Sequence, residues 1–185
     1  KLPSGDEGNQ DQGTTETPEN PGTPEDPGKP EEPETPAPGA LAGKGTETDP
    51  YVITKAEHFK ELNSLIGPAS TTYICLGEDI DMTSVTDYSP LNCLSPFEKV
   101  VHFDGKDHKI SNLSISDEKC NYPSLFGVLN GSCRNLKIEN VSITASSYRC
   151  GVIASSVGRE GKPAVVENVT VTNATITSDY EKAGG

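Results

Sequence analysis

From residue 71 onward, apolar and polar residues alternate in short runs, a pattern that predicts β-strands with one buried face. Three of these runs resemble one another, because each places an asparagine directly before an apolar residue and then continues with a period of two. They are Ile110–Ile115, Cys133–Ile138 and Val166–Val171. A repeat of this kind predicts a solenoid, in which each coil buries its apolar residues by stacking on the next coil.

The spacing of the repeat indicates the length of a coil. It is 23 residues from Leu113 to Leu136 and 33 residues from Leu136 to Val169. The longer spacing indicates an inserted loop at residues 158–162. In this alignment Cys133 occupies an inward position, so we expect it to be a buried thiol.

A second element alternates with the first. Residues 122–128 resemble residues 148–153, which predicts that Cys150 stacks with Phe126, and Tyr180 begins a third copy. Because the sequence stops inside that copy, we expect the natural chain to continue further or its last coil to pair with another chain.

One stretch before the strands has helical spacing. Thr54 and Glu57 form a capping box, in which each side chain satisfies a free amide of the first turn. Gly67-Pro68 ends the pattern. We therefore expect a short amphipathic helix over residues 54–66, with His58 on its polar side. Its apolar positions are Ala56, Phe59, Leu62, Leu65 and Ile66.

Residues 1–40 differ in composition from the rest. They contain ten acidic residues, two lysines and one large aliphatic residue, Leu2, so they cannot bury enough apolar surface to fold. From Pro18 to Pro36 a proline recurs every third residue, as in polyproline II, and the segment from Thr17 to Pro38 extends by roughly 70 Å. We expect a disordered acidic Pro-rich stalk over residues 1–40 and a β-helix domain over residues 41–185. A PxxP ligand for an SH3-like partner and a plain disordered tail are the alternatives.

Charge and cysteine content exclude several classes of function. The net charge of −13, without a basic stripe, argues against binding of nucleic acid or of anionic membrane surfaces. No apolar run is long enough to span a bilayer. Lys1 is not an initiator methionine, so we expect that a secretion signal preceded it. Five cysteines without a CxxC motif do not match a zinc site; Cys75 alternates outward, and Cys93 and Cys120 lie in loops where they can bridge.

Taken together, four segments resemble a known family, the bacterial surface proteins that carry the GLUG motif and are adhesin-like. These segments are Gly43–Ile53 with its Gly-x-Gly-Thr and Asp-Pro-Tyr-x-Ile pattern, Asp79–Asp81, Phe103–Leu113 and the Leu-Phe-Gly element Ser124–Gly127. The resemblance covers about residues 43–185. The later copies of the motif at Cys150-Gly151-Val152 and Ala183-Gly184-Gly185 are looser.

The resemblance implies a fold and a location. The expected fold is all-β, a right-handed parallel β-helix whose N-terminal end is capped by the predicted helix. The expected location is the outer cell surface of a bacterium, often through a lipid-anchored cysteine, which here would lie upstream of Lys1. The resemblance implies no established activity.

Four aspartates and a histidine are candidates for chemistry. Asp79, Asp81, Asp104 and Asp107 suggest paired carboxylates or a calcium site, for which oxygen-rich turns supply ligands. A structural role in turns is the stronger interpretation, since aspartates in turns bond their own backbone. We therefore keep Asp79, Asp81 and Asp104 as calcium candidates. We interpret His108 as packed or turn-stabilising, and His102 as isolated in a strand.

Repeated asparagines and tyrosines suggest two further features. Five asparagines satisfy the N-glycosylation pattern, but the repeat itself generates most of them and favours an asparagine ladder along the solenoid. Tyr122, Tyr148 and Tyr180 recur at the same point of successive copies. If they project outward they form a sugar-stacking strip, and otherwise they cover an edge of the solenoid.

These features lead to one prediction of function with two alternatives. We expect a non-enzymatic, adhesin-like surface module without a cofactor, which binds an extracellular glycan or a host or bacterial surface protein. The first alternative is a polysaccharide-degrading enzyme, since β-helices host lyases and hydrolases. The second is a purely structural surface spacer.

Overall fold

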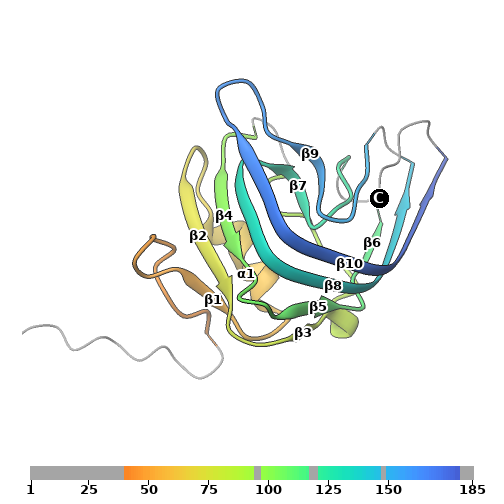
Figure 1. Cartoon of the computed structure of the whole chain (residues 1–185), viewed down its shortest axis with the longest axis horizontal. Coiled ribbons are helices and arrows are strands. Elements are labelled where there is room, and N and C mark those ends of the chain that lie inside the picture. Colours follow the sequence, from red (N-terminus) through yellow and green to blue (C-terminus); the bar gives the residue numbers. More distant parts are fainter. Residues whose placement is uncertain (1–39, 94–96, 117–120, 147–148, 180–185) are drawn as a thin grey trace, which may run out of the picture. The chain divides into compact units, whose positions relative to one another are not determined.

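The computed structural model describes residues 40–93, 97–116, 121–146 and 149–179, which form a parallel β-helix (Figure 1). The stalk predicted over residues 1–40 lies outside the described residues except for Ala40. The strands are β1 (Tyr51–Ile53), β2 (Thr71–Leu76), β3 (Ile80–Asp81), β4 (Val100–Asp104), β5 (Lys109–Ser111), β6 (Ser114–Ser116), β7 (Phe126–Leu129), β8 (Gly131–Ala145), β9 (Ala154–Val157) and β10 (Ala164–Ser178). The helices are α1 (His58–Leu65) and the 3-10 helix η1 (Met82–Ser84).

Successive coils stack through parallel strands. One face carries β1, β2, β4, β8 and β10 in this order, and every pair in it is parallel. The long strand β8 spans more than this face: its first part pairs with β4, its middle with β5 and its end with β6. The predicted parallel β-helix is therefore confirmed.

One of the two predicted spacings is confirmed and the other is wrong. Val169 pairs with Leu136, as the spacing of 33 residues requires. Leu113, in contrast, lies in the run that places Ile115 beside Ile143, so the true spacing there is 28 residues and not 23. The cause is that β8 contains two asparagine–apolar pairs five residues apart, and the earlier run resembles both.

The second repeated element also pairs in a different register from the one that the sequence predicts. Phe126 pairs with Ala154, so the predicted stacking of Cys150 with Phe126 is wrong. The predicted inserted loop is confirmed, because Arg159 and Lys162 bridge as a tight antiparallel turn between β9 and β10 (Figure 1).

Asparagine ladders run along two corners of the solenoid, as predicted. The corner asparagines have a left-handed backbone with φ between 52° and 59°, a conformation that asparagine tolerates better than most residues. Each ladder starts at an aspartate. In one, Asn112 donates to Asp81 (2.9 Å), Asn140 to Asn112 (3.4 Å) and Asn173 to Asn140 (3.2 Å); in the other, Asn135 donates to Asp104 (3.0 Å) and Asn168 to Asn135 (2.9 Å).

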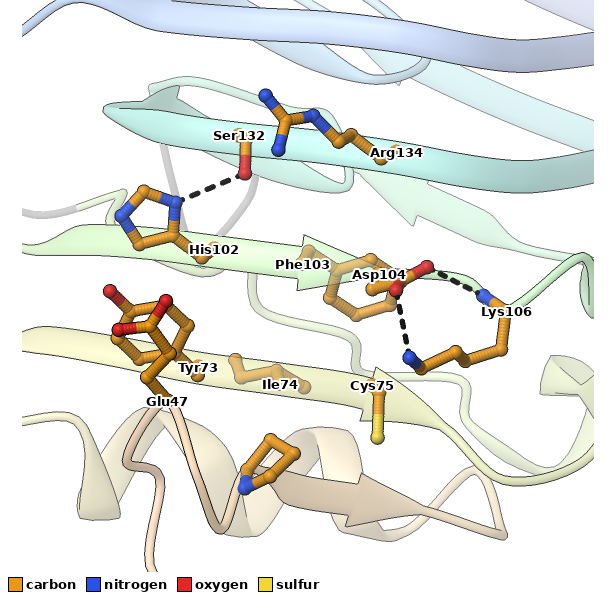
Figure 2. A pocket seen from close by; sticks show the side chains of 11 residues that line it. Glu47, Tyr73, Ile74, Cys75, His102, Phe103, Asp104, Lys106, Ser132 and Arg134 are labelled. Atoms are coloured by element: carbon orange, nitrogen blue, oxygen red, sulfur yellow. Dashed lines mark hydrogen bonds and ion pairs between the residues drawn. The ribbon is translucent and has the colours of Figure 1, made fainter.

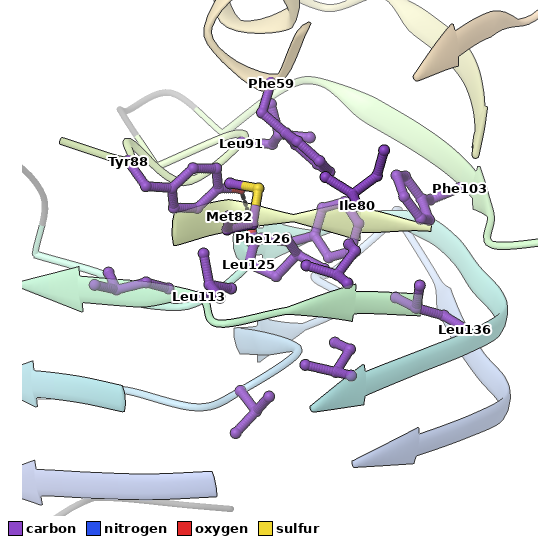
Figure 3. Packing of buried hydrophobic residues seen from close by; sticks show 14 of the residues in the cluster. Phe59, Ile80, Met82, Tyr88, Leu91, Phe103, Leu113, Leu125, Phe126 and Leu136 are labelled. Atoms are coloured by element: carbon purple, nitrogen blue, oxygen red, sulfur yellow. Dashed lines mark hydrogen bonds between the residues drawn. The ribbon is translucent and has the colours of Figure 1, made fainter. Parts of the chain in front are cut away.

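The apolar core fills the interior of the coils (Figure 3). Phe103 of β4 and Phe126 of β7 meet edge to face across it, with ring centroids 5.4 Å apart. Cys133 is fully buried, as expected. Each buried side chain of this size stabilises the fold by about 1.5–3 kcal/mol, so the interior holds the stacked coils together.

Helix α1 covers the core near the N-terminal coil, but it starts later than predicted. The capping box is wrong: the backbone N–H of Thr54 donates to Nδ1 of His58 (3.2 Å), and Glu57 accepts from Ser84 Oγ (3.1 Å) instead. The His58 ring thus accepts the hydrogen bond that was expected to go to Glu57. His58 is therefore buried and does not lie on the polar side of the helix. Phe59 packs edge to face on Tyr88, with ring centroids 6.0 Å apart.

Candidate functional site

The predicted tyrosine strip is described only at its first member. Tyr122 is half-buried and packs edge to face on Phe97, with ring centroids 5.1 Å apart. The Arg159 guanidinium lies 5.6 Å from the Phe97 ring centroid on a neighbouring loop. Tyr148 and Tyr180 lie outside the described residues, so a strip of three stays a prediction.

Each calcium candidate accepts hydrogen bonds from the protein. Asp79 accepts from the backbone N–H of Lys109 (3.1 Å), which lowers the pKa of its carboxyl. The Thr83 hydroxyl, followed by the Asn112 amide, lowers the pKa of Asp81 to about 2. Among the residues that the structure describes, no three His, Cys, Asp or Glu side chains are grouped to hold a metal. Calcium binding at these aspartates stays a prediction.

Asp104, the third calcium candidate, lies at the rim of a hollow. Burial raises the pKa of its carboxyl, but the backbone N–H of Lys106 and the amide of Asn135 outweigh this and lower the pKa overall. Its Oδ2 also forms an ion pair with Lys106 Nζ at 3.1 Å. The Asp104 carboxylate therefore accepts the first hydrogen bond of an asparagine ladder and also lines the hollow.

The hollow, of about 360 Å³, opens on the outer face of β2, β4 and β8 (Figure 2). We call it the outer cleft. Because strands alternate their side chains, the residues that line it on neighbouring strands stand in columns. One column consists of Tyr73, His102 and Ser132, and the other of Cys75, Asp104 and Arg134.

The first column combines two rings with a small hydroxyl. The rings of Tyr73 and His102 stack with centroids 4.7 Å apart and an interplanar angle of 19°. Nδ1 of His102 shares a hydrogen bond with Ser132 Oγ at 3.0 Å. Ser132 is only 6% exposed, so this end of the column is covered.

The second column carries opposite charges. Besides the Asp104–Lys106 pair, Nε of Arg134 forms an ion pair with Glu167 of β10 at 3.0 Å. Figure 2 shows the Arg134 guanidinium extended along β8 toward Ser132. The outer cleft thus offers donors and acceptors side by side with little net charge.

A loop before β1 closes one end of the outer cleft. Glu47 and Pro50 belong to its lining, and the carbonyl of Gly45 accepts from the backbone N–H of Tyr73 at 2.9 Å. A turn between Thr46 and Asp49 fixes the loop through two backbone hydrogen bonds. The glutamate is thereby held at the rim by backbone contacts.

Burial shifts the pKa of two groups in the outer cleft. It lowers the pKa of His102, with Arg134 as a second cause, so the imidazole is neutral at neutral pH. Burial also raises the pKa of the Cys75 thiol, which therefore stays protonated. A neutral imidazole and a neutral thiol suit hydrogen bonding and packing rather than attraction of a charged ligand.

A hydrolytic site needs more than the pair of Ser132 and His102. A catalytic serine–histidine pair requires a third group that orients the other ring nitrogen. The contacts of the described residues include no hydrogen bond to Nε2 of His102. Ser132 is also only 6% exposed, which limits access to its hydroxyl.

No local motif in the sequence indicates this site. Tyr73 and His102 are 29 residues apart, and His102 and Ser132 are 30 apart, so only the coil register brings them together. The prediction that His102 is isolated is wrong, whereas His108 does stabilise a turn, through Nδ1 at 3.2 Å from Asp79. Cys75 does face outward, as expected, since it lines the outer cleft.

Comparison with known proteins supports the fold. A putative immunoglobulin A1 protease from Bacteroides ovatus, known from its crystal structure, matches 70% of this chain with a TM-score of 0.64 and 32% sequence identity. Halomucin from Haloquadratum walsbyi is 36% identical over 121 residues, or 62% of this chain. A protein named "Putative Gly-rich membrane protein" from Evansella cellulosilytica is 31% identical over 137 residues, or 70% of this chain.

The matched segments are small parts of these relatives. They make up 39% of the Bacteroides ovatus chain, 1% of Halomucin and 15% of the Evansella cellulosilytica protein. No protein-family model matches the chain, so membership of the GLUG-motif proteins stays a prediction. In the part of the chain that the structure describes, no helix has the length and apolar character to cross a membrane.

Proposed function

We propose that this chain is a surface-displayed, non-enzymatic β-helix module that binds a glycan in the outer cleft. The single observation that supports this most is the combination there of a stacked aromatic pair with balanced donors and acceptors. Sugar-binding sites need planar polar groups that both donate and accept, because each hydroxyl does both, together with an aromatic surface. The lining includes Tyr73, His102, Asp104, Arg134 and Glu47.

The relatives and the N-terminal composition support surface display. One relative is named as a membrane protein, and the resemblance to GLUG-motif adhesins points to the outer surface of a bacterium. A Pro-rich acidic stalk over residues 1–40 would hold the β-helix away from that surface. A lipid anchor upstream of Lys1 belongs to the same proposal.

The test is binding of the whole chain to an array of mucin, plant and bacterial glycans. For glycans that bind, Arg134→Gln weakens affinity by about tenfold or more, since it removes charge-assisted hydrogen bonds. Lys137→Gln is the matched control, because this lysine is exposed on the same strand and lies outside the lining. Equal affinities of the two variants would contradict the assignment of the site.

A second variant separates the outer cleft from the predicted tyrosine strip. Tyr122→Ala leaves glycan affinity unchanged if the cleft is the site, and lowers it if the strip is. Shortened glycan products would instead support the alternative of a polysaccharide-degrading enzyme. A chain that binds no glycan on the array would favour a protein partner or a structural spacer.

A further inference from the structure

The charged side chains of the outer cleft differ in whether the protein itself pairs them. The lining contains Glu47, Asp104, Lys106 and Arg134. Lys106 Nζ pairs with Asp104 Oδ2 at 3.1 Å, and Nε of Arg134 pairs with Glu167 at 3.0 Å. In the part of the chain that the structure describes, no hydrogen bond or ion pair engages the Glu47 carboxylate, which is exposed. Glu47 therefore carries the charge in this lining that is left for a ligand.

The Glu47 carboxylate lies beside the stacked rings of the first column. The carbonyl of Gly45 accepts from the backbone N–H of Tyr73 at 2.9 Å, which ties the loop that carries Glu47 to this column. Figure 2 shows the carboxylate directed toward Tyr73 and His102. Burial and Arg134 lower the pKa of His102, and Glu47 acts on that pKa in the opposite direction, so its charge reaches the ring. One unpaired carboxylate and an aromatic stack thus border the same part of the cleft.

This arrangement favours a cation over an anion. Aromatic faces attract a cation, and a neighbouring carboxylate adds a direct charge interaction. The two cationic side chains of the lining oppose this only weakly, because a carboxylate already neutralises each of them. The net charge of −13 on the chain also draws cationic ligands toward the surface. An anionic sugar would instead meet the unpaired carboxylate of Glu47 and be repelled by it.

We propose that the outer cleft selects glycans that carry a protonated amino group, and that Glu47 determines this specificity. The inference rests on the proposed glycan site and adds the class of sugar that the site recognises. The ammonium group donates charge-assisted hydrogen bonds to Glu47 at the rim, beside the Tyr73 ring. An N-acetylated sugar has no such charge, so it leaves the Glu47 carboxylate without an ionic partner.

The test compares two oligomers that differ only at the sugar nitrogen. A fully deacetylated chitosan oligomer and the N-acetylated chitin oligomer of the same length are titrated into the whole chain by calorimetry. The buffer is weakly acidic, so that the sugar amines are protonated, and its ionic strength is fixed. The deacetylated oligomer should bind at least about tenfold more tightly.

Two variants assign this preference to one carboxylate. Glu47→Gln removes the charge and keeps the size of the side chain, so it should abolish the preference and leave the affinity for the acetylated oligomer within about twofold of the parent. Asp49→Asn is the matched control, because this aspartate is exposed on the same loop and lies outside the lining. It should keep the preference. Equal weakening by both variants would show a general attraction to an acidic surface and overturn the role of Glu47.

The remaining outcomes separate this inference from the glycan site itself. Equal affinity for the two oligomers, with both still weakened by Arg134→Gln, overturns the amine preference and leaves the glycan site in place. Binding of other glycans on the array, but of neither oligomer, overturns the preference in the same way. If no glycan binds at all, the proposed function fails together with this inference.

Discussion

The side-chain amide of Asn112 donates to the carboxylate of Asp81 at 2.9 Å, across 31 residues of sequence. This contact begins the ladder that continues through Asn140 to Asn173. It joins a turn of the first coil to the corners of the next three strands. The ladder thus fixes which residues stack, and with them the columns that line the outer cleft.

Replacing Asn140 separates two contributions to stability, the side-chain hydrogen bonds of the ladder and the tolerance of asparagine for a left-handed backbone. Asn140→Ala loses two side-chain hydrogen bonds and forces a left-handed backbone on alanine, so we expect a loss of about 1–3 kcal/mol in the free energy of unfolding. Asn140→Gly loses only the hydrogen bonds and should cost less. Urea denaturation measures both, with exposed Ser142→Ala as a control within about 0.5 kcal/mol of the parent. Equal losses for alanine and glycine would show that backbone conformation contributes nothing.

The first rung makes stability depend on pH. The pKa of Asp81 is about 2 in the folded chain against 3.8 for an unperturbed aspartate, so its stabilisation is present above pH 3.8 and is lost as pH falls toward 2. Asp81→Asn keeps an accepting oxygen but does not titrate. The unfolding midpoint of the variant should therefore fall less steeply than that of the parent in this window. Parallel pH profiles would contradict the assigned role.

Cys133 should be chemically inert in the folded chain. Burial raises the pKa of its thiol to about 12, and the thiolate is the reactive form. Iodoacetamide treatment followed by peptide mass spectrometry should find Cys133 unmodified in buffer and modified in denaturing urea. Modification at similar rates in both conditions would show that the interior at β8 opens readily.

Gly105 permits the closest approach between coils at the turn after β4. A Cβ there would lie 2.4 Å from the carbonyl oxygen of Asn135, so Gly105→Ala forces the backbone to shift. We expect a loss of about 2 kcal/mol or more in the free energy of unfolding. Gly67→Ala is the matched control, because its Cβ would meet nothing within 4 Å. A loss of similar size in the control would remove the steric explanation.

The parallel β-helix could be predicted from the sequence, because each asparagine marks a corner with a left-handed backbone and the apolar residue after it marks a buried position. It misassigned one register, since Asn135 and Asn140 each precede an apolar residue and resemble Asn112 equally. Only contacts between coils distinguish them, and these favour Asn140. Helix α1 started late for a similar reason, because the His58 ring replaced a cap that local sequence assigned to Glu57.

The outer cleft could not be predicted from the sequence, because it depends on how successive coils pair. Its residues share no local motif, and their proximity arises from the strand register, in which paired residues of successive coils are 28 to 33 residues apart in β5, β6, β8 and β10. The residues that line the cleft can be identified only when the asparagines at the corners of successive coils have been paired correctly. Tyr73, His102 and Ser132 then fall into one column.

The most direct test of glycan binding in the outer cleft is a proton NMR titration of the histidine rings. The chain has three histidines: His58 is buried at the start of α1, His108 lies on a turn beside Asp79, and His102 lines the outer cleft. Oligosaccharide pools released from mucin, plant cell wall and bacterial capsule are added in turn. The account predicts that at least one pool shifts the His102 resonance in a saturable way and leaves His58 and His108 in place. Saturable binding that leaves His102 unmoved, or no shift with any pool, would contradict it.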